Sequence, residues 1–367
     1  MILLTISKKC INFAIMKHIK IRNLGPIKEA DIELKRINVI IGPQSSGKSC
    51  VLKTACYCTW VEKRIELTQS ADFFAKDGNF TKEFERFHKL KGYIKPDTFI
   101  SYESEFMSFS FDNASNKFNF KWKEGRWDYH RSKVTYIPAE RNLVAAIPNW
   151  FQVKFADDNI RDFMADWESA RQATKEDLEV LNLGVSYRYD AATKSDKVQV
   201  SEGVTLDFTN TSSGLQSVIP LFIHLSHITN IRHSRIESFA NLQEQGVLLA
   251  KLDEEDKKDV FTNYVHTHHC DIFLEEPEAN LFPPTQANLV EWLLTKTEGK
   301  HPNSLFIATH SPYILNAFIE KQEIDMTLLY TKTTDDGFMT VKSAIEEDIQ
   351  AIYDFGVDAF FNIETLG

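Results

Sequence analysis

Apolar and polar positions near the start of the chain predict three strands followed by a helix. Positions 18–23 and 30–34 alternate apolar with polar residues, which is typical of strands with one buried face. Residues 37–41 form a nearly continuous β-branched run, as expected for a strand buried on both faces. A glycine-rich turn at 42–47 then leads into a helical pattern at 49–66. This order predicts strand, loop and helix.

Further along, helical patterns alternate with short apolar strands. Helices are expected at 157–183, 215–231, 234–268 and 284–296, and strands at 134–137, 270–274, 305–308, 327–330 and 338–341. Two hairpins are expected, one within 106–122 and one joining 185–189 to 197–208. Because helices alternate with buried strands at both ends of the chain, we predict an α/β core with an α+β insertion.

The composition limits the class of protein. Of the 367 residues, 43% are hydrophobic and 26% charged, which fits a globular chain with a sizeable core and argues against disorder. The apolar stretch 218–225 is too short to span a bilayer, so we expect no membrane segment. With 42 Lys and Arg against 52 Asp and Glu, the net charge is −10. Any contact with nucleic acid must therefore be local.

The cysteines and the first residues indicate a cytoplasmic protein. Five cysteines in a chain of this length do not suggest a disulfide framework, and we expect reduced thiols packed as small hydrophobes. The first ten residues place their apolar stretch before the lysines, which is the reverse of a secretory signal. Met16 opens a segment typical of a domain start, so residues 1–15 are expected to be an N-terminal extension.

The turn at 42–49 satisfies the phosphate-binding pattern GxxxxGK[ST] in full. Glycines allow backbone N–H groups to approach phosphate oxygens, and the following helix presents its positive end to the same anion. Lys48 is expected to reach the β- and γ-phosphates, and Ser49 to hold Mg²⁺ through its hydroxyl. The residues expected to contact the nucleotide here are Gly42, Pro43, Gln44, Ser45, Ser46, Gly47, Lys48, Ser49 and Cys50.

Two carboxylates follow the apolar strand 270–274. Ligands of a parallel sheet bind at the carboxyl ends of its strands, where Glu275 and Glu276 emerge. One carboxylate can support Mg²⁺, and the next can polarise an attacking water as a general base. The alternative is a solvated acidic turn at the end of a strand, and a complete phosphate-binding loop in the same chain makes this alternative less favoured.

Two further motifs could contact the nucleotide, but each also has an ordinary structural explanation. His310 follows the strand 305–308 and could contact the γ-phosphate or the attacking water, although a histidine at a strand end is usually structural. Ser213 and Gly214 open the apolar helix with free N–H groups and a favourable dipole for phosphate, although such a pair alone is an ordinary helix cap.

Taken in order, these motifs resemble the RecF/SMC-like ABC ATPases, particularly the short bacterial AAA-domain proteins related to OLD-type and PtuA-type ATPases. The segments that carry the resemblance are IRNLGPI, GPQSSGKS, YIPAERN, TSSGLQS, FLEEPEANLFP and IATHSPYIL. The resemblance implies the α/β fold of an ABC-ATPase head, in which a P-loop core sheet has an antiparallel β subdomain, with a helical, α+β insertion lobe.

The resemblance also assigns roles to residues. It implies that Ser213, Gly214 and Gln216 occupy the ABC signature positions, and that 278–282 is the D-loop. It implies that Glu275 takes the Walker B position on the metal. Glu276 is then the catalytic glutamate and His310 the switch histidine, acting with Lys48 on ATP and Mg²⁺.

The chain also departs from the family pattern. No clear glutamine follows the phosphate-binding loop, and the segment 136–141 is a candidate to replace it, which makes Glu140 and Arg141 candidate site residues. No SMC-length coiled coil fits between Ser49 and Ser213, so the charged stretch 226–268 is at most a stub. Only 57 residues follow His310, too few for a Toprim nuclease domain, so we expect no nuclease activity in this chain.

These features predict four segments. Residues 1–15 are the extension, and 16–66 with 270–345 form the ATPase core lobe. Residues 67–269 form the inserted lobe with the signature motif, and 346–367 are a C-terminal tail.

The leading hypothesis is an ATPase whose ATP-bound homodimer, or higher even-numbered oligomer, is a switch for a partner in anti-phage defence or DNA repair. The expected partner is an effector protein, a nuclease or toxin, encoded nearby. The basic, aromatic segment 117–133 is either a contact for a partner or nucleic acid, or a solvated strand face. The alternative function is an ATP-binding regulatory module or scaffold with negligible turnover. A P-loop kinase is disfavoured, because it leaves the Ser-Gly and Thr-His segments unexplained.

Overall fold

The predicted strands, loop and helix at the start of the chain form one end of the fold. The computed structural model describes residues 17–231, 250, 257–298, 302–321 and 325–355. Strands β1 (Lys17–Leu24) and β2 (Ile27–Leu34) pair in antiparallel register. Strand β3 (Ile37–Ile41) is buried at every position, and helix α1 (Lys48–Thr68) follows the glycine-rich loop.

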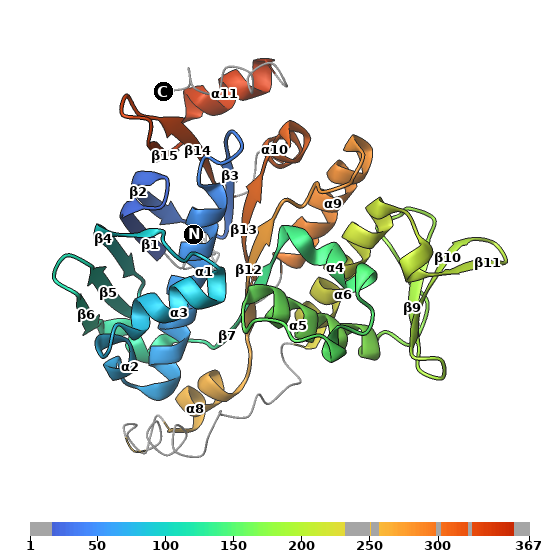
Figure 1. Cartoon of the computed structure of the whole chain (residues 1–367), viewed down its shortest axis with the longest axis horizontal. Helices are drawn as coiled ribbons and strands as arrows, with labels where there is room; N and C mark the ends of the chain where they lie inside the picture. Colours follow the sequence, from blue (N-terminus) through green and yellow to red (C-terminus); the bar gives the residue numbers. More distant parts are fainter. Residues whose placement is uncertain (1–16, 232–249, 251–256, 299–301, 322–324, 356–367) are drawn as a thin grey trace, which may run out of the picture.

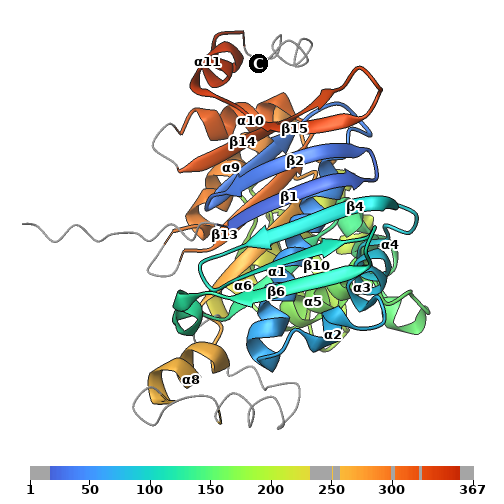
Figure 2. The same ribbon diagram turned by 90° about the vertical axis from the view of Figure 1, so that its left-hand side faces the viewer.

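The described residues build one large mixed sheet of eleven strands (Figure 2). Its order is β6-β5-β4-β1-β2-β15-β14-β3-β13-β12-β7. The parallel half comprises β7 (Ser132–Ile137), β12 (His269–Glu275), β13 (Ser304–Thr309), β3 and β14 (Met326–Thr333). The antiparallel part adds β4 (Ile94–Glu103), β5 (Met107–Asp112) and β6 (Lys117–Trp122) beyond β1, and β15 (Met339–Ser343) connects it to the parallel half.

Helices cover both faces of the parallel half, which explains the continuous apolar runs of its strands. Alternate residues of each strand enter opposite cores: Ile40 and Phe273 pack toward α1, whereas Val39 and Ile272 pack toward the other face. That other face is covered by α5 (Asn159–Ala173), α6 (Ser213–Ile231), α9 (Pro283–Lys296) and α10 (Pro312–Ile319) (Figure 1). The predicted α/β fold class is confirmed.

A second, smaller antiparallel sheet lies at the far side of α5 and α6 (Figure 1). It contains β8 (Leu178–Glu179), β9 (Ser186–Asp190), β10 (Ser195–Ser201) and β11 (Val204–Asp207). The helix predicted at 157–183 is therefore too long. It ends at Ala173, and the chain turns back at Leu181 and Asn182, which both have positive φ, so that β8 pairs with β9.

The described residues also include the α-helices α2 (Asp72–Ala75), α3 (Asn79–His88), α4 (Leu143–Ala146), α8 (Lys257–Val265) and α11 (Glu346–Phe355). Residues 1–15, much of the predicted charged helix 234–268 and the end of the predicted tail 346–367 lie outside the described residues. No helix in the described ranges has both the length and the apolar composition needed to cross a membrane.

The segment predicted as an inserted lobe, 67–269, contributes to both sheets. Its strands β4–β7 hydrogen-bond into the large sheet, and β8–β11 make the small one. Strand β4, which the sequence pattern did not predict, lies between β1 and β5 and joins the two. The division of the chain into four segments stays a prediction. The cysteines at 50, 56, 58 and 270 are buried, as expected.

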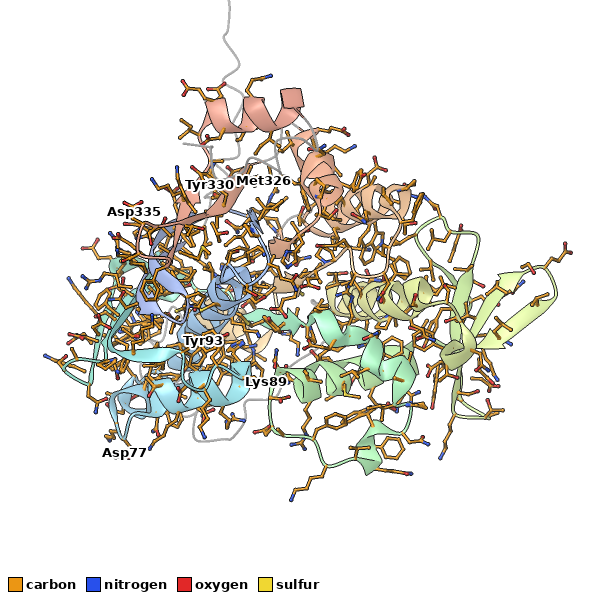
Figure 3. The ribbon with its side chains drawn as sticks, turned by 45° about the horizontal axis from the view of Figure 1, so that its top comes forward. Asp77, Lys89, Tyr93, Met326, Tyr330 and Asp335 are labelled. Atoms are coloured by element: carbon orange, nitrogen blue, oxygen red, sulfur yellow. The ribbon has the colours of Figure 1, made fainter. Side chains whose placement is uncertain are left out.

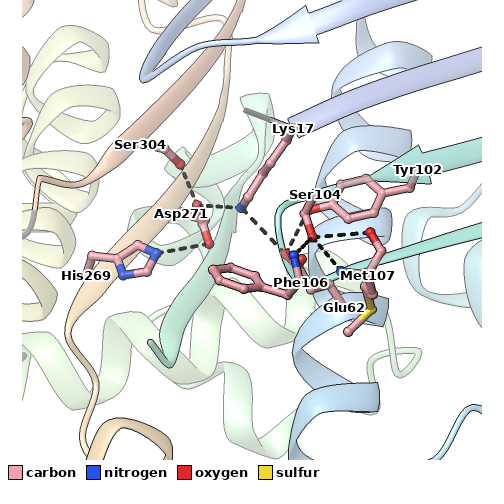
Figure 4. Close-up of polar contacts among 9 residues, drawn as sticks. All are labelled: Lys17, Glu62, Tyr102, Ser104, Phe106, Met107, His269, Asp271 and Ser304. Carbon is pink, nitrogen blue, oxygen red and sulfur yellow. Dashed lines mark hydrogen bonds and ion pairs between the residues drawn. The ribbon is translucent and has the colours of Figure 1, made fainter. Parts of the chain in front are cut away.

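A buried polar network fastens β1 to α1, β12 and β13 at the amino end of the parallel strands (Figure 4). The Lys17 ammonium lies 3.3 Å from Asp271 Oδ1 and 3.9 Å from Glu62 Oε2. Ser304 donates to Asp271 at 2.6 Å, and the Tyr102 hydroxyl donates to Glu62 at 2.7 Å. Burial opposes ionisation of Asp271, but Lys17 and the hydrogen bonds hold its pKa well below the usual range. The network therefore contains a charged, buried pair.

Replacing Asp271 by alanine should lower the free energy of unfolding by about 3 kcal/mol, because the Lys17 ammonium loses its nearest buried partner. Since the folded-state pKa of Asp271 is lowered, its contribution is present above the unfolded value of about 3.9 and is lost as the pH falls below it. Chemical denaturation at pH 7 and at acid pH measures both effects. The control is Asp325→Ala, which removes an exposed pair with Lys35 and should leave the unfolding midpoint nearly unchanged.

Candidate nucleotide-binding site

The loop between β3 and α1 is shaped by two glycines that no other residue can replace without displacing neighbours. A Cβ atom on Gly42 would lie 1.9 Å from Thr331 Oγ1. Gly47 has φ +88°, and a Cβ there would lie 2.5 Å from Ile27 Cδ1. Ser45 also adopts a positive φ, of 62°. The loop is therefore held tightly between β14 and the turn that joins β1 to β2, which bends the backbone around the start of α1.

Lys48 folds back onto this loop. Its ammonium donates to the carbonyl oxygens of Gly42 at 2.9 Å and Pro43 at 2.7 Å. Burial lowers the pKa of Lys48 to about 8, although the charges of Glu276 and Glu278 act in the opposite direction. The nearby Ser46 hydroxyl is fully buried and has no hydrogen-bond partner among the described residues. A phosphate group at this loop would provide acceptors for both side chains, so the residues present fit a nucleotide.

The two predicted carboxylates lie at the carboxyl end of β12, which β13 separates from β3, the strand that leads to the loop. Glu275 is buried, and its Oε1 lies 3.9 Å from the Lys53 ammonium. Glu276 has φ +43°, and its N–H donates to the carbonyl of Ala308 on β13 at 2.8 Å. Its carboxylate is partly exposed, in contrast to that of Glu275. The neighbouring carboxylates therefore have different environments.

His310 contacts Glu276 directly. Its Nε2 lies 3.4 Å from Glu276 Oε1, and this contact is the main reason that the pKa of Glu276 is lowered. The His310 backbone N–H donates to Glu278 Oε1 at 2.6 Å. The next residue, Ser311, caps α10 by accepting from two backbone N–H groups, and this cap fixes where His310 leaves the strand. The structure thus brings the predicted histidine and glutamate together.

The predicted signature residues begin α6 and lie next to the segment 278–282 of the same chain. A Cβ on Gly214 would lie 3.0 Å from the carbonyl oxygen of Asn280. The Asn280 side chain donates to Ser217 Oγ at 2.8 Å. Gln216 donates to two carbonyls of its own preceding loop, each at 3.0 Å, whereas Ser213 is exposed. Of the three signature residues, Ser213 is thus the one that faces solvent with its side chain.

The candidate residues Glu140 and Arg141 differ in their exposure to solvent. They lie on the short 3₁₀ helix Ala139–Asn142, where Glu140 is exposed and Arg141 is 1% exposed. Arg141 donates to backbone carbonyls around the end of β12. Three residues of the site were not predicted from the sequence: Thr331 packs against Gly42, Ser217 accepts from Asn280, and Gln286 accepts from Ser311. No motif marks these three positions, since each acts through a contact between segments distant in sequence.

Several side chains of the basic segment 117–133 make ion pairs or ring contacts within the protein. Lys123 pairs with Glu103 at 2.6 Å, and Lys133 pairs with Asp166 at 3.0 Å. The Arg126 guanidinium stacks between the rings of Trp122 and Trp127 and donates to Gln69. Phe118 packs inward against Phe74, Phe80 and Phe109. Lys117 and Lys121 remain exposed on β6, an edge strand of the large sheet. Contact with nucleic acid through this segment stays a prediction.

A magnesium ion would find its donors in Ser49 and Glu275. Mg²⁺ typically uses one or two protein ligands and completes its shell with phosphate and water. The described residues contain no group of three or more His, Cys, Asp or Glu side chains that could hold a metal ion.

A glycine-rich loop with a lysine, placed between a parallel strand and a helix, is the site of P-loop nucleotide-binding proteins. The model of the AAA domain family matches residues 18–267, and the chain belongs to this family. No curated protein matches the sequence. The narrower likeness to OLD-type or PtuA-type ATPases stays a prediction.

Solved structures similar to this chain include heads of SMC proteins. The SMC head domain from Thermotoga maritima is 10% identical, with a TM-score of 0.45 and coverage of 90% of this chain and 99% of that one. The Smc head domain with an extended coiled coil, bound to the C-terminal domain of ScpA from Pyrococcus furiosus, is 10% identical, with a TM-score of 0.46 and coverage of 92% and 98%.

Because the pKa of Lys48 is about 8, the affinity for ATP should fall as the pH rises above that value. Bound phosphates favour the protonated amine, so binding at pH 9 takes up a proton and is weaker than at pH 7 by up to about tenfold. Calorimetric titration with ATP across pH 7 to 9.5 measures the slope. Lys48→Arg is the control, because its guanidinium stays charged and should give a flat profile. An equal slope in both proteins would contradict the assignment of Lys48.

Proposed function

We propose that the protein hydrolyses ATP with Mg²⁺ at this site. The observation that carries the proposal is the contact between Glu276 and His310, 3.4 Å apart, which follow the carboxyl ends of β12 and β13 in the same sheet as β3 and its phosphate-binding loop. The Glu276 carboxylate is ionised at neutral pH, as a general base for water must be.

The residues divide the work as follows. Lys48 and the N–H groups at the start of α1 bind the β- and γ-phosphates. Ser49 and Glu275 would hold Mg²⁺, which would supply positive charge to the phosphate oxygens. Glu276 orients the attacking water and accepts its proton, while His310 holds the Glu276 carboxylate in place. The two acids differ in exposure, which matches this division: buried Glu275 serves the metal and the more exposed Glu276 meets water.

We further propose that ATP joins two copies of the chain. Ser213 is exposed at the start of α6, where backbone N–H groups and the helix dipole favour a phosphate. Two large apolar side chains are also exposed: Phe282 before α9 is 76% exposed, and Tyr313 in the first turn of α10 is 45% exposed. Both follow carboxyl ends of adjacent parallel strands, so they lie on the nucleotide edge. A C2 dimer with ATP at its interface would cover this apolar surface.

In this proposal the dimer is a switch, because hydrolysis removes the γ-phosphate that both subunits contact. Its partner would be a nuclease or toxin encoded nearby, or a nucleic acid, in anti-phage defence or DNA repair, and it would act in the cytoplasm. The family gives this biological context by analogy only. The neighbouring genes are the observation that tests it most directly.

Glu276→Gln should slow ATP hydrolysis by about 10² or more while leaving ATP affinity nearly unchanged, because one catalytic proton acceptor is lost. Glu275→Ala should instead weaken the dependence of binding and turnover on Mg²⁺. Phosphate release and ATP binding, each measured against Mg²⁺ concentration, separate the two effects. Lys48→Ala should lose binding or turnover altogether.

Three results would decide against these roles. Equal loss of ATP affinity in the Glu275 and Glu276 variants refutes their division of work. Wild-type turnover in Lys48→Ala refutes the phosphate-binding loop. Tight ATP binding by the wild type with no phosphate release, with or without DNA, favours the alternative of a regulatory ATP-binding module.

The Glu276→Gln protein should accumulate as a dimer, or a higher even-numbered assembly, in ATP and Mg²⁺. Adding Ser213→Arg should block this state by placing bulk and charge at the joint, and it should leave ATP binding at the phosphate-binding loop intact. Light scattering with and without ATP measures both proteins. A monomer under every condition would exclude the ATP-joined dimer.

A further inference from the structure

Arg141 uses all of its hydrogen-bonding capacity on the protein backbone. A guanidinium has five N–H donors. Its Nε donates to the carbonyl of Ser217 at 3.0 Å, and its NH1 group to those of Glu275 at 3.0 Å and Pro138 at 3.3 Å. Its NH2 group donates to the carbonyls of Glu276 at 2.8 Å and Pro277 at 3.2 Å. Five donors thus meet five carbonyl oxygens.

The charge of Arg141 is kept although the side chain is buried. Burial lowers its pKa to about 10, and the acids Glu278, Glu276 and Glu275 limit this decrease. The group is therefore a cation at neutral pH. Burying a charge is costly unless every donor is satisfied, and only the planar fork of arginine reaches five acceptors in different directions. Lysine, with three donors from one point, cannot reproduce the arrangement.

Four of the five acceptors belong to two separate parts of the candidate site, and the fifth, Pro138, precedes the short helix of Arg141 itself. Glu275 ends β12, and Glu276 and Pro277 follow it, so this part carries both acids. Ser217 lies one helical turn after Ser213 and Gly214 in α6. The same two parts also touch through Asn280, whose side chain donates to Ser217 and whose carbonyl abuts Gly214. Arg141 thus links the start of the signature helix to the acidic strand end within one subunit.

The backbone of Glu276 has an unfavourable conformation that hydrogen bonds from neighbouring residues must stabilise. Its φ of +43° is in the left-handed region, which non-glycine residues rarely adopt unless neighbouring contacts hold them there. Its N–H is fixed by Ala308 and its carbonyl by Arg141. These two bonds set the direction in which the Glu276 side chain leaves the strand toward His310.

We propose that Arg141 is a positioning residue that holds Glu276 in its catalytic direction and couples it to the start of α6. In this role it does not bind the nucleotide, because all five of its N–H donors are used on backbone carbonyls. When a phosphate contacts Ser213 and Gly214, a shift of the first turns of α6 changes the hydrogen bond from Arg141 to Ser217, and the same guanidinium transmits the shift to Glu276. This inference rests on the proposed ATPase function.

The test compares Arg141→Lys and Arg141→Met with Arg171→Met. Arg171 is a matched control, because it is also a buried arginine but pairs with Glu168 and Asp196 between α5 and the small sheet. The Arg141 variants should lose at least about tenfold in kcat, the scale of misplacing one catalytic group, with ATP affinity within about threefold of the wild type, and lysine should not restore turnover. Arg171→Met should lower stability and keep kcat.

A double-mutant cycle separates positioning from a general loss of structure. If Arg141 acts through Glu276, Arg141→Met should slow the Glu276→Gln enzyme little further, so that the two losses do not add. Additive losses, or an Arg141→Lys enzyme with wild-type kcat, would overturn the proposal.

Amide hydrogen exchange with and without ATP distinguishes failure of this inference from failure of the proposed function. A wild type without turnover removes the ATPase proposal alone. In the wild type, ATP should change exchange across 213–217 and 275–281 together, and in Arg141→Met the change at 275–281 should be lost although ATP still binds. Independent responses of the two segments in the wild type, or a joint response retained in Arg141→Met, would overturn the coupling.

Discussion

The candidate site depends on the register of three adjacent parallel strands. Glu275 on β12 pairs with Ala308 on β13, and Ala308 pairs with Ile40 on β3. Glu276 follows β12, His310 follows β13 and Gly42 follows β3, each one or two residues after these paired positions. The predicted catalytic and phosphate-binding groups therefore emerge at one edge of the sheet. A slip by one residue would turn every side chain of a strand to the opposite face. The two different cores on either side, one on α1 and one on α5, α6, α9 and α10, oppose such a slip.

This constraint explains how much could be predicted from the sequence. The phosphate-binding loop, the two acids and the histidine each follow a short apolar run, and the carboxyl ends of parallel strands meet at one edge. Local pattern and one general rule were therefore sufficient to bring Lys48, Glu276 and His310 together. The rest depends on long-range contacts. Thr331 against Gly42, and Asn280 against Gly214, join segments far apart in sequence, and no local pattern encodes such pairs.

The errors have related causes. The helix predicted at 157–183 has helical periodicity beyond Ala173, but the pairing of β8 with β9 and the turn at Leu181 and Asn182 end it earlier. Strand β4 was not predicted, because Lys95, Pro96 and Asp97 near its start are unusual in strands. Its strand conformation depends on the neighbouring strands β1 and β5. In the basic segment, the composition was recognised correctly, but the sequence could not show that Arg126 stacks on two tryptophans.

The two sides of the site differ in how far the protein itself prepares them. On the phosphate side, the Lys48 ammonium is engaged by the carbonyls of Gly42 and Pro43, so nucleotide binding must exchange two internal hydrogen bonds for bonds to phosphate. On the acidic side, the backbone around Glu276 is fixed by Ala308 and Arg141, and His310 is already beside the carboxylate. Rigid groups lower the cost of reorganisation during reaction. The structure therefore concentrates its adaptable interactions around Lys48 and its fixed ones around Glu276, which matches the proposed division between nucleotide binding and hydrolysis.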